Sequence, residues 1–149
     1  MIAISFNGMQ MSGDLSIGST GLVQDDSLTT CVLVSLFTDR RARPDDPLPA
    51  GNGDYRRGWV GDALADRSDD RIGSRLWLLR REKQTEETRR RAEEYCREAL
   101  AWLVSDGLAS RIDVSAEWVR QGLLGVVIVI DRVDGERERH AIDVTTGAV

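Results

Sequence analysis

Residues 38–79, TDRRARPDDPLPAGNGDYRRGWVGDALADRSDDRIGSRLWLL, have the most selective composition of the chain. From Asp39 to Arg75 they contain eight aspartates and eight arginines, but no glutamate and no lysine. The planar guanidinium group of arginine pairs bidentately with a carboxylate, and the short aspartate side chain holds its partner close to the backbone. Trp59, Trp77 and five glycines lie among or beside these charges. The pattern predicts a structured recognition loop rather than a linker.

The length and composition predict one domain over residues 1–149, in which the glycine-rich residues 1–25 form an arm that a partner orders. The net charge of −5 and pI near 4.9 argue against binding driven by phosphate neutralisation. No apolar run approaches the roughly 20 residues of a membrane span, and the first residues lack the basic region of a signal peptide. We therefore expect a protein made in the cytoplasm.

Apolar residues at helical spacing predict a first helix over residues 27–37, capped by Asp26 or Ser27. The β-branched residues within 31–34 leave a strand open as the alternative. Three prolines then hold residues 44–49 extended. Two further helices are expected, a short one at about 61–65 and a second that begins at residue 72 or 73 and ends at residue 81.

Residues 85–105 give the clearest helical pattern, with Thr85 as N-cap, an apolar stripe that includes Trp102, and Gly107 placed to end the helix. Cys96 in this helix and Cys31 in the first helix are expected to be buried free thiols.

Three strands are expected at the end of the chain, over 112–119, 123–132 and 139–144, with turns at Gln121-Gly122 and Asp134-Gly135. The middle strand is apolar on both faces, which predicts cover on both sides, and the polar last strand is typical of a sheet edge. Alternating Ile2, Ile4 and Phe6 leave open a fourth strand from the N-terminus. The predicted fold class is α+β, with several helices packed on a small C-terminal antiparallel sheet.

The sequence offers no recognisable catalytic, metal or cofactor site. His140 is the only histidine, and no nucleophile motif, phosphate loop or zinc spacing accompanies it. Asp45-Asp46 or Asp69-Asp70 could bind a hard cation, but pairing with the interleaved arginines is favoured. We predict that the protein is not an enzyme and has no cofactor.

Two surfaces suit protein–protein contact. Trp59 within Arg56-Arg57-Gly58-Trp59 is a plausible anchor, since tryptophan and arginine dominate interface hot spots, but it could equally cap the domain's own core. The last strand offers an edge that a partner strand could extend. The arginines and tryptophans could instead stack on single-stranded nucleic acid, so a small nucleic-acid-binding or regulatory module is the alternative function.

The chain resembles the Mu-type phage baseplate proteins, the gene product forty-six family. The resemblance is carried by SLFTDRRA, DDPLP, RRGWVGD, DRIGSRLWLLRREKQTEET and AEEYCREALAWLVSDGLA, and extends from about Asp14 to the C-terminal strands. The chain is also similar to the wider sheath-initiator family. The Thr-x-x-Gly-Glu-Arg segment of that family has its counterpart in this chain at Thr38-Asp39-Arg40-Arg41. The glutamate is missing here, and Asp39 or Asp45 is the candidate replacement.

The resemblance implies a structural, non-catalytic component of a contractile phage tail, located in the virion baseplate. It implies six copies around the tail hub, each held by a large wedge protein and each continuing the strand exchange of the sheath. The expected partners are thus other wedge and hub proteins and the sheath protein, with no nucleic acid and no membrane. The candidate partner-binding residues are Asp39, Arg40, Arg41, Arg56, Arg57, Trp59, Asp62, Arg71, Arg75, His140 and Ile142.

Overall fold

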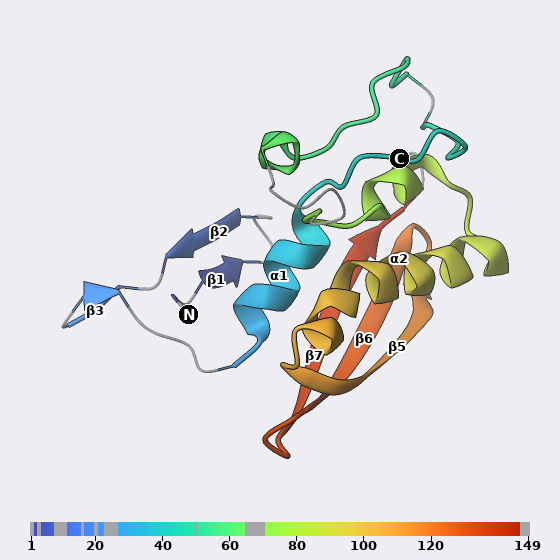
Figure 1. The fold of residues 1–149 in the computed structure, drawn as a ribbon. Helices are drawn as coiled ribbons and strands as arrows, with labels where there is room; N and C mark the ends of the chain where they lie inside the picture. Colours follow the sequence, from blue (N-terminus) through green and yellow to red (C-terminus); the bar gives the residue numbers. More distant parts are fainter. Residues whose placement is uncertain are drawn as a thin grey trace.

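The computed structural model describes residues 2, 4–7, 12–15, 17–19, 21–22, 27–49, 51–64 and 71–146 (Figure 1). Its centre is a three-stranded antiparallel sheet with helices packed against it, so the predicted α+β class is confirmed. The sheet contains β5 (Ala109–Arg120), β6 (Leu123–Arg132) and β7 (Arg137–Thr145) in the order β5-β6-β7.

Both predicted hairpins are present. Gly122 and Gly135, at the two turns, have φ angles of 73° and 92°, a left-handed conformation that glycine adopts at little cost. β7 lies at an edge as expected, and its side chains alternate so that Val144 is buried while Asp143 is exposed. The pairing register is therefore set by the buried alternate positions.

Helix α2 (Glu86–Ser105) crosses one face of this sheet (Figure 1). The Thr85 Oγ1 accepts a hydrogen bond from the Thr88 N–H at 3.1 Å, which confirms the predicted N-cap. Cys96 and Leu100 are fully buried, but Trp102 is 37% exposed, so its assignment to the buried stripe was wrong. The indole of Trp102 lies at the side of α2 and donates to Ser35 Oγ of the first helix at 3.0 Å.

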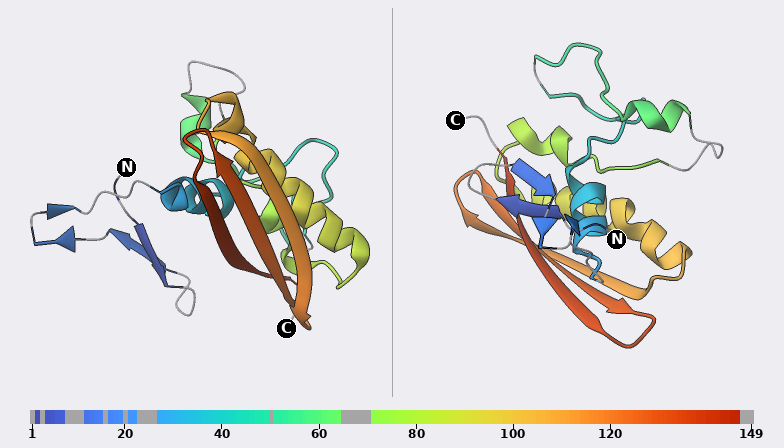
Figure 2. Two further views of the ribbon diagram at one scale, coloured as in Figure 1. Left: turned by 90° about the horizontal axis from the view of Figure 1, so that it is seen from below. Right: turned by 90° about the vertical axis from the view of Figure 1, so that its left-hand side faces the viewer.

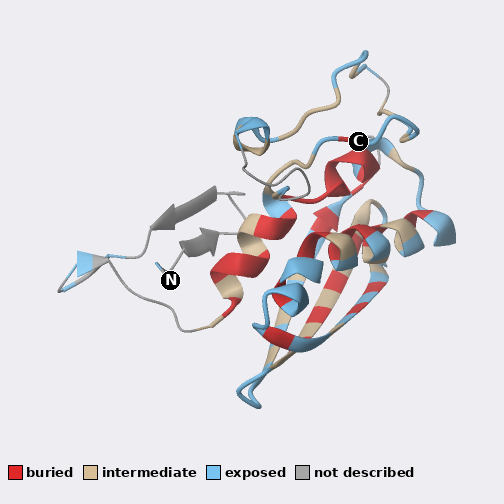
Figure 3. Cartoon of the chain, viewed as in Figure 1, coloured by how far each residue is buried: buried red, intermediate tan, exposed pale blue. Residues whose placement is uncertain are grey.

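The described helices all lie on one side of the sheet, as the second view of Figure 2 shows. On that side Val126, Ile128 and Ile130 of β6 are buried, whereas Val127 and Val129, which point to the other side, are only partly buried (Figure 3). The prediction that the central strand is covered on both faces was therefore wrong within the described residues. An apolar run in one strand indicates how buried a strand is, but not how many layers cover it.

Residues 31–34 lie within helix α1 (Thr29–Phe37), so the strand alternative is excluded. Helix α1 packs beside α2 (Figure 1). It has no side-chain N-cap of its own, because Leu28 occupies that position. The Leu28 N–H donates instead to both oxygens of Glu138, at 3.0 and 3.1 Å, from strand β7. A carboxylate at the positive end of a helix is stabilising, so the cap comes from 110 residues further along the chain. Ser27 Oγ accepts a hydrogen bond from the Thr29 N–H at 3.2 Å, so Ser27 does bind a backbone N–H of the first turn as predicted, and Asp26 lies outside the described residues.

The described part of the N-terminal arm forms two small hairpins apart from the main sheet (Figures 1 and 2). Strand β1 (Ile4–Asn7) pairs with β2 (Ser12–Leu15), and β3 (Ile17–Gly18) pairs with β4 (Gly21–Leu22). The alternation at Ile4 and Phe6 does form a strand, but the fourth strand of the C-terminal sheet is not found there. Its backbone groups pair locally with β2 instead.

The central segment contains two 3₁₀ helices, η1 (Val60–Ala63) and η2 (Leu76–Arg81). Leu76, Trp77 and Leu79 are buried as predicted. Helix η2 begins at Leu76 rather than at residue 72 or 73, because Ser74 pairs with Asp39 in a β-bridge. Cys31 and Cys96 are both free and buried, which confirms the thiol prediction. Burial raises the pKa of Cys96 to about 12.

Candidate interaction site

The ends of the arginine- and aspartate-rich segment are joined by a short parallel bridge between Asp39 and Ser74. The Arg40 N–H donates to the Ser74 carbonyl, and the Ser74 N–H donates to the Thr38 carbonyl, each at 2.9 Å. Gly73 has a φ of 98°, and a Cβ at this position would clash with the Thr38 carbonyl. This close approach requires glycine and explains why residues 73–75 do not belong to η2.

Arg75 is the charged centre of the segment and is only 3% exposed. Its Nε donates to Glu98 Oε2 at 2.9 Å, and its Nη1 donates to Asp46 Oδ1 at 2.7 Å. The guanidinium also stacks over the Tyr95 ring, 4.4 Å from the centroid. Glu98 and Tyr95 both lie on helix α2, whereas Asp46 lies in the loop, so Arg75 fastens the loop onto α2.

Glu98 of α2 collects further arginines. Arg43 Nη2 lies 2.8 Å from Glu98 Oε1, and Arg40 Nη1 lies 3.9 Å from the same oxygen. Burial alone would raise the pKa of this carboxyl, but the hydrogen bonds from Arg75 and the three nearby positive charges lower it overall. Glu98 is therefore ionised wherever the protein is folded near neutral pH.

The loop between the prolines and η1 is fixed by two adjacent arginines. Arg56 donates to the Arg43 carbonyl and, at 3.0 Å, to the Pro44 carbonyl, while the Ala42 N–H donates to the Arg56 carbonyl at 2.9 Å. Arg57 Nη1 donates to Asp39 Oδ2 at 2.5 Å, and its guanidinium lies over Trp77, 4.6 Å from the ring centroid. These bonds fasten residues 56 and 57 to residues 39–44, where the loop begins.

Beyond these anchors the loop exposes apolar side chains. Trp59 is 52% exposed, and Tyr55, Val60 and Leu64 are 67%, 79% and 82% exposed. The Trp59 ring lies so close to Gly61 that a Cβ there would clash with it, and the ring is not part of the core. The alternative in which Trp59 caps the domain's core is therefore wrong. We call these four residues the apolar loop surface.

The side chains of Asp62 and Arg41 both form hydrogen bonds with backbone groups. Asp62 Oδ1 accepts from the Ile72 N–H at 3.2 Å and so connects η1 to the segment that leads into η2. Arg41 Nη1 donates to the Arg57 carbonyl at 3.4 Å. Arg71 is exposed. Both Asp62 and Arg41 thus help to hold the shape of the loop.

The structure places His140 and Ile142 away from this loop, on strand β7. Both side chains belong to the face that the helices cover: Ile142 packs against the core, and His140 Nε2 lies 3.1 Å from Glu138 Oε2. The candidate residues thus form two groups, one in the loop and one on the sheet edge. A partner at β7 would meet the backbone of the strand rather than these two side chains.

Of the carboxylates that could have suggested a cation site, Asp46 is engaged with arginine. Asp46 binds Arg75, and its Oδ2 accepts from the Arg43 N–H at 2.7 Å, while Asp45 is exposed. Asp69-Asp70 and the end of the helix predicted at 61–65 lie outside the described residues. Arg57 pairs with Asp39 and Arg75 pairs with Asp46, as internal pairing predicts. Four further arginines of the segment bond to Glu98 or to backbone carbonyls instead: Arg40, Arg41, Arg43 and Arg56.

Glu98 and Glu138 are the two residues of this framework that sequence reasoning missed. Arg75 and Glu98 are 23 residues apart, and Leu28 and Glu138 are 110 apart. Each glutamate looks like an ordinary surface residue of its own element. A signal for Glu98 was available: it lies three residues after Tyr95 of the buried stripe, a spacing that makes the two side chains neighbours on the helix surface.

Comparison with known proteins adds the family. Residues 28–137 match the model of the family described as phage protein GP46. The chain is 51% identical over 123 residues to the baseplate protein gp46 of Escherichia phage Mu, covering 83% of this chain and 82% of that protein. This chain belongs to the GP46 family.

A second GP46 relative is the Mu-like prophage FluMu protein gp46 of Haemophilus influenzae. It is 38% identical over 128 residues, which cover 86% of this chain and 85% of the relative. The family match contains the whole arginine- and aspartate-rich segment, both helices and most of the sheet. Within the described residues, no helix is long and apolar enough to cross a membrane.

Proposed function

We propose that this protein is a structural component of the baseplate of a contractile phage tail and acts as a single unit through protein–protein contacts. The observation that carries the proposal is the 51% identity to the Mu baseplate protein over 83% of this chain. A likeness of this extent covers the loop as well as the core, so it favours a shared role as well as a shared fold.

The apolar loop surface is the proposed docking site. Large apolar side chains exposed along one short segment suit an interaction surface, and tryptophan is a frequent hot-spot residue. The loop beneath Trp59 is held by Arg56, Arg57 and Asp62, so little ordering entropy is lost on binding. Arg40, Arg41, Arg71 and Arg75 would contribute mainly by fixing or surrounding this loop.

The finer role that we propose is that of a wedge or sheath-initiator protein, with six copies around the tail hub. Support comes from the edge position of β7, whose outer side pairs with no strand among the described residues. Such an edge can accept a strand from a sheath subunit through backbone hydrogen bonds. Neighbouring wedge or hub proteins would then be held by the apolar loop surface.

A pull-down from a co-expressed tail gene cluster tests the proposal. We expect the wild-type chain to recover other tail proteins and Trp59→Ala to recover at least about tenfold less, since a hot-spot truncation costs 2 kcal/mol or more. Val133→Ala is the matched control, because Val133 is 62% exposed at the β6–β7 hairpin and belongs to no proposed surface. It should recover tail proteins as the wild type does.

Two results would count against the proposal. If the wild-type chain recovers no tail protein, the baseplate role fails. If Trp59→Ala and the wild type recover the same proteins equally, the role stands but the apolar loop surface is not the dock. Circular dichroism and the melting temperature of each variant show whether it remains folded.

A further inference from the structure

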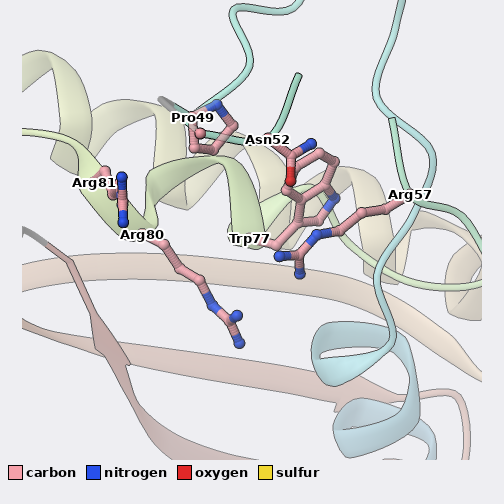
Figure 4. A pocket seen from close by; sticks show the side chains of 7 residues that line it. Pro49, Asn52, Arg57, Trp77, Arg80 and Arg81 are labelled. Atoms are coloured by element: carbon pink, nitrogen blue, oxygen red, sulfur yellow. The ribbon is translucent and has the colours of Figure 1, made fainter. Parts of the chain in front are cut away.

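A small cationic pocket lies between the loop and helix η2 (Figure 4). Its volume is about 240 Å³, and its walls include Arg57, Trp77, Arg80 and Arg81. None of the seven residues that line it is acidic; the other three are Pro49, Gly51 and Asn52. The chain as a whole carries a net charge of −5, so this concentration of positive charge runs against the overall balance.

Arg57 is held in one position by its neighbours. It has a φ of 53° and is the only residue other than glycine with a positive φ in the described part of the chain. A left-handed conformation costs such a residue roughly 1 kcal/mol or more, and it persists only where the surroundings impose it. Here Asp39 and the ring of Trp77 fix the guanidinium, and the Trp77 indole is itself fixed, because it donates to the Arg40 carbonyl at 2.8 Å.

Arg80 provides the second guanidinium. It follows the buried Leu79 at the end of η2 and is exposed. Figure 4 shows Arg57 and Arg80 extending from opposite sides toward the space beside Trp77. Each guanidinium group offers a planar fork of N–H donors, which can bind a carboxylate or a phosphate through two hydrogen bonds.

The size of the pocket and the charge of the protein favour a carboxylate over the phosphates of a nucleic acid. Pockets for drug-sized molecules occupy about 300–1,000 Å³, so the present pocket fits a single side chain or a chain end. A polyanion such as nucleic acid would bring many phosphates toward an acidic protein, which is unfavourable outside the pocket. One or two carboxylates on a neutral peptide incur no such repulsion.

We propose that this pocket binds a glutamate or aspartate side chain of an acidic segment in a partner protein. The inference rests on the proposed function, since it names the chemistry of a partner that binds at the same loop. The carboxylate lies between Arg57 and Arg80, with Arg81 adding positive charge, while the apolar loop surface binds the flanking part of the partner.

The test uses the purified, isotopically labelled protein and the peptide acetyl-Ser-Glu-Glu-Ser-amide. Titration is followed by nuclear magnetic resonance of the arginine Nε–H groups and the tryptophan indole N–H groups. We expect saturable shifts of the Arg57, Arg80 and Trp77 signals with a Kd of about 1 mM or tighter, and none with the matched acetyl-Ser-Gln-Gln-Ser-amide peptide. Because the peptide needs no tail protein, its binding is independent of the outcome of the pull-down.

Variants locate the binding. Arg80→Gln should weaken peptide binding about fivefold or more, because a charge-assisted hydrogen bond is lost. Arg139→Gln, an exposed arginine near the start of β7, makes the same change in net charge and should leave the Kd within about twofold. Spectra that overlay outside the pocket show that both variants keep the fold.

Three outcomes would overturn the proposal. They are the absence of shifts up to about 10 mM peptide, equal shifts with the glutamine peptide, and equal binding by Arg80→Gln and the wild type. A final titration uses inorganic phosphate at matched ionic strength in place of the peptide. If phosphate shifts the pocket signals and the glutamate peptide does not, the pocket is a phosphate site and the protein partner is excluded.

Discussion

Single residues fix the recognition loop, and they do so through backbone geometry as much as through charge. Gly73 allows the Thr38 carbonyl to approach the chain, which lets Ser74 pair with Asp39. Arg75 is thereby directed toward Glu98 and Asp46. The sequence showed the arginines and aspartates as a set, but not that one glycine and one glutamate outside the set determine their arrangement.

Gly73→Ala should destabilise the protein by more than about 2 kcal/mol. The left-handed backbone costs roughly 1 kcal/mol for alanine, and the new Cβ must displace the Thr38 carbonyl, which accepts a hydrogen bond from Ser74. Gly135→Ala is the matched control: its φ of 92° is similar, but no atom lies within 4 Å of the added Cβ. Urea unfolding should give the control a loss of only about 1 kcal/mol. Equal losses would show that the close approach at Gly73 does not matter.

Glu98 should make stability fall in acid. Its pKa is lowered in the folded protein, so it contributes stability above its usual pKa of 4.5, and this contribution is lost as the pH falls through the lowered value. We expect Glu98→Gln to be less stable than the wild type at pH 7, because it leaves the buried Arg75 with one carboxylate partner fewer. The difference should shrink below about pH 4. A constant difference from pH 7 to pH 3 in urea unfolding would contradict this assignment.

At the scale of elements, local patterns predicted the helices and hairpins well. The Thr85 cap, the stripe of α2 apart from Trp102, and the two glycine turns depend on residues within a few positions of one another, and they were confirmed. What could not be predicted depends on distant partners. Examples are the cap of α1 by Glu138, the local pairing of β1 with β2, and the single layer of helices on the sheet. None of these leaves a periodic signal in the sequence.

Glu138→Gln should loosen α1 selectively. The glutamine amide has one acceptor oxygen for the Leu28 N–H where the carboxylate has two, and it carries no negative charge at the helix N-terminus. The expected loss of stability is about 1 kcal/mol. Hydrogen exchange should speed up in residues 29–37 and remain unchanged in α2. Glu94→Gln, on the exposed face of α2, is the control and should alter neither helix. Uniformly faster exchange in both helices would show that Glu138 acts on the whole fold instead.

At the scale of the whole molecule, the described part of the chain presents two separate surfaces. The sheet, α2 and η2 form a single buried core, and the arginine network fastens the recognition loop to it. The apolar loop surface lies at one place and the free edge of β7 at another, which suits a protein that joins two neighbours (Figure 1). The candidate loop residues were found from the sequence because their composition is unusual, whereas the cationic pocket needed the fold to bring Arg57 beside Arg80.

The most direct measurement is cryo-electron microscopy of contractile tails purified from cells that produce this protein. The account predicts density for this chain in the baseplate, in six copies, with residues 51–64 against a second protein. It would be contradicted by intact tails that lack this chain, or by a baseplate in which residues 51–64 face only solvent.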